Sequence, residues 1–153
     1  MTHHFVSAKS KKQGEVMNYK ITAFVTSVIA FMLGIGYLFF GSLIIGRWQI
    51  EPTNSVLLIG RRMGALYIGL SIIFFLSRSV SLSNVRVALS IGAAFTLSLL
   101  AILGIYEYSA GRAGIGILAS TLIESLLSAA YIIIFFKDRK ASAMGSSINI
   151  KSS

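Results

Sequence analysis

The sequence predicts an all-α, polytopic membrane protein: a four-transmembrane-helix bundle with both termini cytoplasmic. Three observations lead to this class. Charged residues make up only 12% of the chain, whereas soluble domains carry roughly 25%. Hydrophobic residues reach 55% of 153 residues, which is more apolar surface than one small globular core can bury. The apolar residues also gather into four long runs separated by short polar segments.

Each run is long enough to cross a bilayer as a helix, which needs about 20 mainly apolar residues. No run alternates apolar and polar residues as a barrel strand would, and a helix satisfies its own backbone hydrogen bonds in lipid. We therefore predict one transmembrane domain over residues 21–136, with spans at about 21–45, 55–77, 87–106 and 113–136.

The first span is too long for a signal-peptide core, and no Ala-x-Ala-like cleavage site follows it, so we predict a retained anchor. Residues 1–20 are predicted to form a flexible basic tail, and residues 137–153 a second flexible tail of mainly small and polar residues. Met17 stands just before the first span. Translation is expected to start at Met1 or at Met17, which an intact-mass measurement would decide.

Small residues mark helix contacts in the second span, where Gly60 and Gly64 are one turn apart. Such pairs let membrane helices approach closely. Packing within one bundle is the simpler interpretation, and a dimer interface is the alternative.

The positive charges predict the orientation. Only Arg47 and Arg112 lie in the loops after the first and third spans, while Arg61 and Arg62 lie inside the second span. Ten other basic residues lie on the opposite side, namely Lys9, Lys11, Lys12, Lys20, Arg78, Arg86, Lys137, Arg139, Lys140 and Lys151. Because cytoplasmic segments carry an excess of Lys and Arg, both termini are predicted to face the cytoplasm, at the bacterial inner membrane.

The net charge of +9 follows the same distribution. In a soluble chain it would suggest nucleic acid, but orientation in a membrane explains the placement better. We expect no nucleic-acid partner, and we expect the basic tails to meet membrane lipid.

Glu124 lies near the middle of the fourth span. A charged side chain there costs about 2.5–3.5 kcal/mol on insertion scales, so it must pair, take up a proton or face water. Ser120 and Ser128 lie four residues to either side of it, and Thr121 is adjacent to Ser120. Residues four apart share a helix face, so this face turns a polar stripe away from lipid.

Arg61 and Arg62 are the predicted partners of Glu124. Counted from the start of its span, Arg62 lies roughly 10 Å deep and Glu124 roughly 16 Å deep, at about 1.5 Å per residue. The difference is about the length of an arginine side chain. Adjacent helix residues point about 100° apart, so one arginine can face inward while the other extends to the interface.

The candidate site is therefore a polar core or binding site, and Arg112 in the outer loop is an additional candidate. Its predicted members are Arg61, Arg62, Ser120, Thr121, Glu124 and Ser128. The chain has no cysteine, and its two histidines, His3 and His4, lie at the start of the first tail. No nucleophile–base pair, metal cluster or phosphate-binding loop is present in the sequence, so we expect no enzyme activity, cofactor or metal.

The chain resembles a group of small bacterial four-helix membrane proteins that have no assigned activity. The likeness covers most of residues 20–136. It rests on the segment GRRMGALYIGL (60–70), on Gly111-Arg112 and on Glu124. In that group an arginine begins the second helix, glycines follow it and an acid lies in the fourth, which implies that Arg62 and Glu124 share one site. A weaker likeness is to small multidrug-resistance transporters, but their buried glutamate lies in the first helix, which carries no charge here.

Two functions follow as expectations. The first is an accessory or interaction protein of the inner membrane, with an Arg62–Glu124 core, acting as a homo-oligomer or with a membrane-protein partner. The second is a small proton-coupled transporter or carrier that uses Glu124.

Overall fold

The computed structural model describes the backbone of residues 3–150 and the side chains of residues 18–140. All regular secondary structure of the described chain is helical, and no strand occurs in it. Its elements are α1 (His3–Phe39), α2 (Gly41–Arg47), α3 (Asn54–Ser77), α4 (Asn84–Ser109) and α5 (Gly116–Ile150).

Four of these helices contain a segment that is long and apolar enough to cross a membrane. The segments are Asn18–Phe39, Asn54–Ser77, Asn84–Ser109 and Gly116–Lys140. The all-helical class and the four candidate spans predicted from the sequence are thereby confirmed.

The first span ends earlier than predicted. α1 stops at Phe39, Phe40 leaves the helical conformation (φ −124°, ψ 27°), and the short α2 follows. The turn is possible because Ile44 of α2 packs back over Gly36 of α1, where a Cβ would lie 2.7 Å from Ile44 Cδ1. Continuous apolarity in the sequence therefore concealed a break in the helix.

The ends of the chain also differ from the predicted boundaries. α1 reaches back to His3 and α5 continues to Ile150, so both helices run past the predicted limits of the spans at residues 21 and 136. The single proline of the chain, Pro52, lies far from both junctions, so no proline interrupts the helices there. The side chains of His3, His4 and Met17 lie outside the described part.

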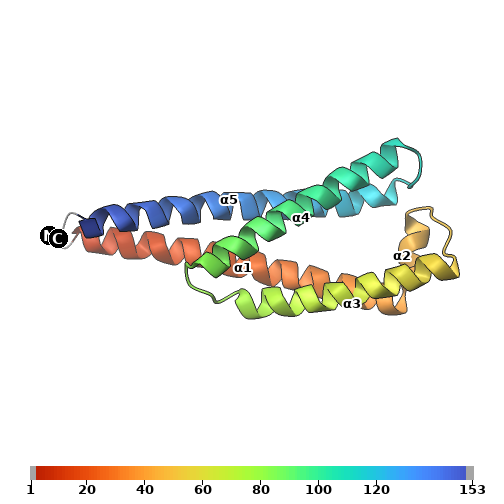
Figure 1. Cartoon of the computed structure of the whole chain (residues 1–153), viewed down its shortest axis with the longest axis horizontal. Coiled ribbons are helices and arrows are strands. Elements are labelled where there is room, and N and C mark those ends of the chain that lie inside the picture. The colour runs from red at the N-terminus through yellow and green to blue at the C-terminus, as the bar shows by residue number, and fades with distance from the viewer. Residues whose placement is uncertain (1–2, 151–153) are drawn as a thin grey trace.

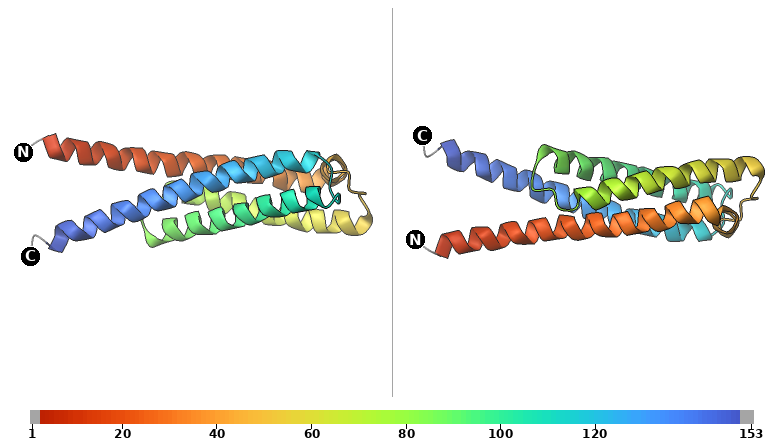
Figure 2. Two further views of the ribbon diagram at one scale, coloured as in Figure 1. Left: turned by 90° about the horizontal axis from the view of Figure 1, so that it is seen from above. Right: turned by 90° about the horizontal axis from the view of Figure 1, so that it is seen from below.

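The helices form two antiparallel pairs. α1 packs along α3, and α4 packs along α5, while the two pairs meet chiefly through α1 and α5. Both termini lie at one end of the molecule, and α2 lies at the other (Figures 1 and 2). We call these the terminal end and the α2 end.

Glycines set the close approach of α1 and α3. A Cβ on Gly64 would lie 2.9 Å from the carbonyl oxygen of Gly34, and Gly60 packs on the rings and methyl groups of Tyr37 and Ile45. The predicted packing role of Gly60 and Gly64 within the bundle is confirmed. This contact also fixes the rotation of α3 about its own axis.

The terminal half of the molecule holds the core. Tyr131 of α5 has no exposed surface. Its ring packs against Phe74 of α3, with centroids 5.8 Å apart, and its hydroxyl donates to Thr26 Oγ1 of α1 at 3.1 Å. One side chain thus joins both pairs.

A buried ion pair closes the terminal side of this core. Arg86 Nη2, near the start of α4, lies 2.9 Å from Asp138 Oδ1 of α5. The two side chains are only 1% and 2% exposed. The guanidinium also lies over the ring of Tyr19 in α1, 4.5 Å from its centroid. The sequence analysis counted Arg86 only as a signal of orientation and did not foresee this pair.

Candidate functional site

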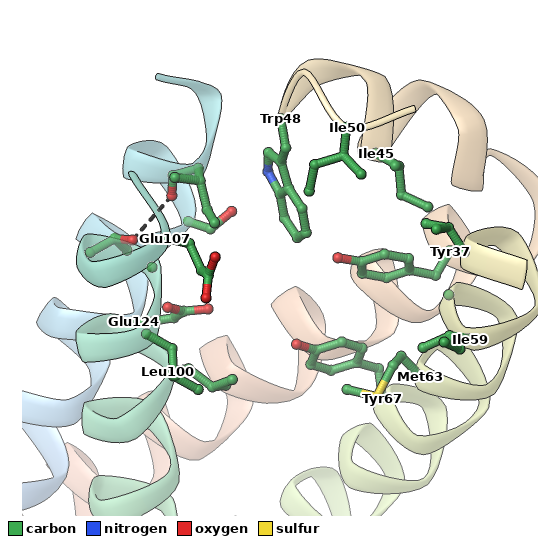
Figure 3. Close-up of a pocket in the computed structure, with 17 residues that line it drawn as sticks. Tyr37, Ile45, Trp48, Ile50, Ile59, Met63, Tyr67, Leu100, Glu107 and Glu124 are labelled. Atoms are coloured by element: carbon green, nitrogen blue, oxygen red, sulfur yellow. Dashed lines mark hydrogen bonds between the residues drawn. The ribbon is translucent and has the colours of Figure 1, made fainter. Parts of the chain in front are cut away.

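A cavity of about 310 Å³ lies between the two helix pairs towards the α2 end. All five helices and the loop after α2 contribute to its lining, which is mostly apolar. Figure 3 shows acidic side chains on the side formed by α4 and α5, and aromatic side chains on the side formed by α1, α2 and α3.

Glu124 reaches this cavity from α5 together with Ser120 and Thr121, so half of the predicted site residues meet here. Its side chain is only partly exposed. Among the described side chains, no hydrogen bond or ion pair joins Glu124 to another residue.

The predicted pairing of Glu124 with Arg61 or Arg62 is wrong. Both arginines are exposed, and neither lines the cavity. The reason is the rotation of α3: Gly60 and Gly64 lie buried against α1. Steps of about 100° per residue then turn Arg61 to the flank and Arg62 to the opposite face of the helix.

The polar stripe of α5 has two roles along its length. Thr121 is buried at the cavity and donates to the carbonyl of Ile117 at 3.1 Å. Ser128, one turn beyond Glu124, leaves the cavity and packs between α4 and α5. It donates to the carbonyl of Ala94 at 3.0 Å and lies 2.7 Å from Ser98 Oγ.

Three aromatic residues complete the cavity and were missed from the sequence. Tyr37 and Tyr67 stack with centroids 6.0 Å apart and planes 8° from parallel, and Trp48 meets Tyr37 edge-on at 6.2 Å. The hydroxyls of both tyrosines point into the cavity (Figure 3). Tyr67 follows Gly60 by seven residues, two helical turns, so the small-residue face of α3 was a usable signal for it.

Arg112 does not line the cavity but binds Glu107, which does. Its guanidinium binds both carboxylate oxygens of Glu107, with Nε–Oε2 at 2.6 Å and Nη2–Oε1 at 3.1 Å. This hydrogen bonding raises the pKa of Arg112 above its ordinary value. Glu107 also lines the cavity, but Arg112 balances its charge. Glu124 is therefore the cavity carboxylate without a cation beside it among the described side chains.

The cavity opens between α3 and α4, which make little direct contact. Its lining residues there are exposed: Ile59 and Met63 on α3 are 62% and 38% exposed, and Leu103 on α4 is 46% exposed. No group of three or more His, Asp or Glu in the described residues is placed to hold a metal ion. The arrangement suits an organic molecule better, because apolar and aromatic walls surround a few polar groups.

Fold and cavity together define the class of protein: a helical bundle with four candidate membrane spans and a ligand-sized cavity between two helix pairs. Comparison with protein-family models, with curated proteins and with solved structures finds no match in any of the three.

Proposed function

We propose that this chain is a multi-pass protein of the bacterial inner membrane, and that it is a small carrier for organic cations. In this proposal both termini face the cytoplasm, the cation binds in the cavity beside Glu124, and a proton replaces it there when it leaves. The observation that carries the proposal is the placement of Glu124 in an aromatic cavity, with no cationic side chain of the described chain beside it.

The charge of Glu124 calls for a counter-charge. A carboxylate in a candidate membrane span is costly unless it is paired, protonated or hydrated. Arg61 and Arg62 are turned away and Arg112 is bound to Glu107. Water can hydrate the carboxylate, but only a proton or a bound cation balances its charge.

The aromatic wall favours a cation with an apolar body. Tyr37 and Tyr67 stack on each other and turn their hydroxyl oxygens to the cavity. The partial negative charge of these oxygens favours a cation over a neutral molecule, while the rings pack on its apolar body. Tyr37, Tyr67 and Trp48 lie on the side facing Glu124 (Figure 3). A volume of about 310 Å³ is at the small end of ligand pockets, which span roughly 300–1,000 Å³.

A single carboxylate supports coupling to protons. Glu124 holds either the proton or the cation, because the two neutralise the same charge. Binding of one then releases the other, which is the exchange that a proton-coupled carrier needs.

The placement of basic residues supports the orientation. Both termini lie at one end of the molecule, and most Lys and Arg residues of the sequence belong to the tails and to the loop between α3 and α4. Such an excess is typical of the cytoplasmic side.

The accessory role predicted from the sequence depended on an Arg62–Glu124 core. Since these side chains do not pair in the structure, we rank that role second. Stable co-purification with a larger membrane complex would restore it.

The test measures binding by calorimetry in detergent, with benzyltrimethylammonium and its uncharged carbon isostere, neopentylbenzene. We expect the wild type to bind the cation and to discriminate against the isostere. Glu124→Gln should weaken cation binding at least tenfold. Glu51→Gln is the matched control, because Glu51 is exposed and lies outside the cavity, and it should bind as the wild type does.

Equal binding of the cation and the isostere would overturn cation recognition. Proteoliposomes test the transport step separately: a cation flux that a pH gradient drives and that Glu124→Gln abolishes supports the carrier. Binding without any flux would leave a cation-binding protein and refute the carrier.

A further inference from the structure

Arg61 and Arg62 are the most unusual surface residues of the described chain. Both are exposed, and neither makes a hydrogen bond or an ion pair with a described side chain. Both lie inside the candidate span Asn54–Ser77. Two cations in a membrane helix need a partner of opposite charge.

The surroundings of Arg62 are those of a lipid-facing surface. Leu58 and Leu66, one turn to either side on the same face, are 59% and 62% exposed. This face lies opposite the one that Gly60 and Gly64 bury against α1. Arg62 therefore interrupts an apolar stripe that no other helix of the described chain covers.

The depth of the pair places it just below the membrane surface. α3 has 24 residues, or about 36 Å at 1.5 Å per residue, against a hydrocarbon core of about 30 Å. If α3 is centred in that core, the Cα atoms of Arg61 and Arg62 lie roughly 8–10 Å below its edge. An extended arginine can reach the interface from this depth.

The direction of α3 favours this reach. Side chains on a helix tilt towards its N-terminus, and the N-terminus of α3 lies at the α2 end, next to the nearer interface (Figure 1). We therefore expect both side chains to lean towards the nearer interface and away from the centre of the span.

We propose that Arg61 and Arg62 bind the phosphate of an anionic membrane lipid in the leaflet at the α2 end. A guanidinium presents paired N–H donors that match two phosphate oxygens, and it is more weakly hydrated than an ammonium. The lipid tails would lie along the exposed leucines of α3. The inference rests on the membrane insertion in the proposed function and not on the ligand of the cavity.

A second copy of the chain is a poorer partner, because its acids are committed or misplaced. The chain has five acidic residues. Asp138 and Glu107 are ion-paired, and Glu124 faces the cavity. Glu15 precedes the first candidate span and Glu51 precedes α3, so neither shares the depth of the arginines.

The test is lipid binding by native mass spectrometry of the intact chain released from detergent. The probes are phosphatidylglycerol, diacylglycerol with the same acyl chains, and inorganic phosphate. We expect selective binding of phosphatidylglycerol, weakened roughly thirtyfold by the double variant Arg61→Gln/Arg62→Gln. The double variant Arg61→Lys/Arg62→Lys should retain part of the affinity, because it keeps the charge but loses the paired donors.

Arg47→Gln is the matched control. Arg47 is an exposed arginine at the same end of the molecule but outside the candidate spans, and its loss should leave the affinity within about threefold. Melting curves in detergent establish that each variant is folded.

Unchanged lipid binding by the folded glutamine variant would overturn the proposal. So would equal binding of inorganic phosphate, which would indicate a site for the free anion, or a wild-type dimer that the glutamine variant dissociates. A separate experiment tests membrane insertion by washing membranes that contain the wild type with alkaline carbonate. Release of the protein would refute insertion, independently of the result on lipid binding.

Discussion

Three carboxylates on α4 and α5 have different surroundings, and their surroundings decide what each can do. Asp138 is buried against Arg86, and Glu107 is bound at the surface by Arg112. Glu124 faces the cavity with no such partner among the described side chains. The carboxylate of Asp138 is thus part of the core, that of Glu107 is part of a surface ion pair, and that of Glu124 is positioned to bind a ligand.

At Asp138 we expect a large loss of stability on substitution. Asp138→Ala removes the carboxylate from a guanidinium that is only 1% exposed. Breaking a buried pair from one side costs about 3–5 kcal/mol, because the remaining charge loses its compensation. Equilibrium unfolding in mixed detergent micelles measures this difference.

Arg112→Gln is the contrasting variant, since it breaks an ion pair whose side chains are 53% and 37% exposed. It should change the free energy of unfolding very little, because solvent screens exposed pairs. Equal losses in both variants would contradict the assignment of a structural role to the Arg86–Asp138 pair alone.

At Glu124 we expect cation binding to weaken as the pH falls. The carboxylate must be ionised to bind a cation, so affinity is full above its pKa in the free protein and is lost as the pH drops through that value. Calorimetric titrations of benzyltrimethylammonium across a pH series measure this. In the wild type, one proton should be released per cation in the acidic range, and Glu124→Gln should release none.

The sequence predicted part of this site for a physical reason. Ser120, Thr121 and Glu124 stand out because polar groups are rare in an apolar helix, and they do meet in the cavity. Their partners were not predictable from spacing, since depth along a helix says nothing about rotation. The burial of Gly60 and Gly64 supplies that rotation and turns Arg61 and Arg62 outward.

Among the elements, α3 depends on the absence of side chains where it contacts α1. In Gly64→Ala the new methyl carbon would lie 2.9 Å from the Gly34 carbonyl oxygen and 3.1 Å from Tyr37 Cβ. The two helices must separate, at a cost of about 1–3 kcal/mol. Thermal melting in detergent should show a lower midpoint for this variant.

Gly69→Ala in the same helix is the control, because no atom lies within 4 Å of a Cβ at this position. It should melt at or slightly above the wild-type temperature, since alanine favours a helix over glycine by up to about 1 kcal/mol. If both alanine variants melted alike, close packing at Gly64 would not be the property that matters.

The positions of the membrane-length helices were the most predictable part of the fold. Lipid-facing surface requires long apolar runs, and these runs mark the four candidate spans. The break at Phe40 was not predictable in the same way, because Gly41-Ser-Leu-Ile-Ile continues the apolar run while α2 folds back on Gly36. The pair of Arg86 and Asp138 was hidden because charges beside a span look like signals of orientation.

In the whole molecule, Tyr131 of α5 links the two helix pairs through its contacts with α1 and α3. Tyr131→Phe loses the hydrogen bond to Thr26 and should cost about 1 kcal/mol. Tyr131→Ala also loses the packing on Phe74 and should cost about 3–5 kcal/mol. Spin labels at the exposed residues Leu58 on α3 and Ile102 on α4 should show a broader distance distribution only in the alanine variant.

Each helix pair is made of neighbours in the sequence, and this has a consequence for biogenesis. α1 and α3 can associate before the ribosome has made α4, because their contacts need nothing from the second half of the chain. We then expect an unbroken backbone through the short link after Arg78 to be dispensable for this association. Two polypeptides, residues 1–80 and 81–153, should reassemble into one complex when co-expressed and co-purify through a tag on either. Each half carries two candidate membrane spans, so we expect the two halves to form as separate helix pairs before they dock.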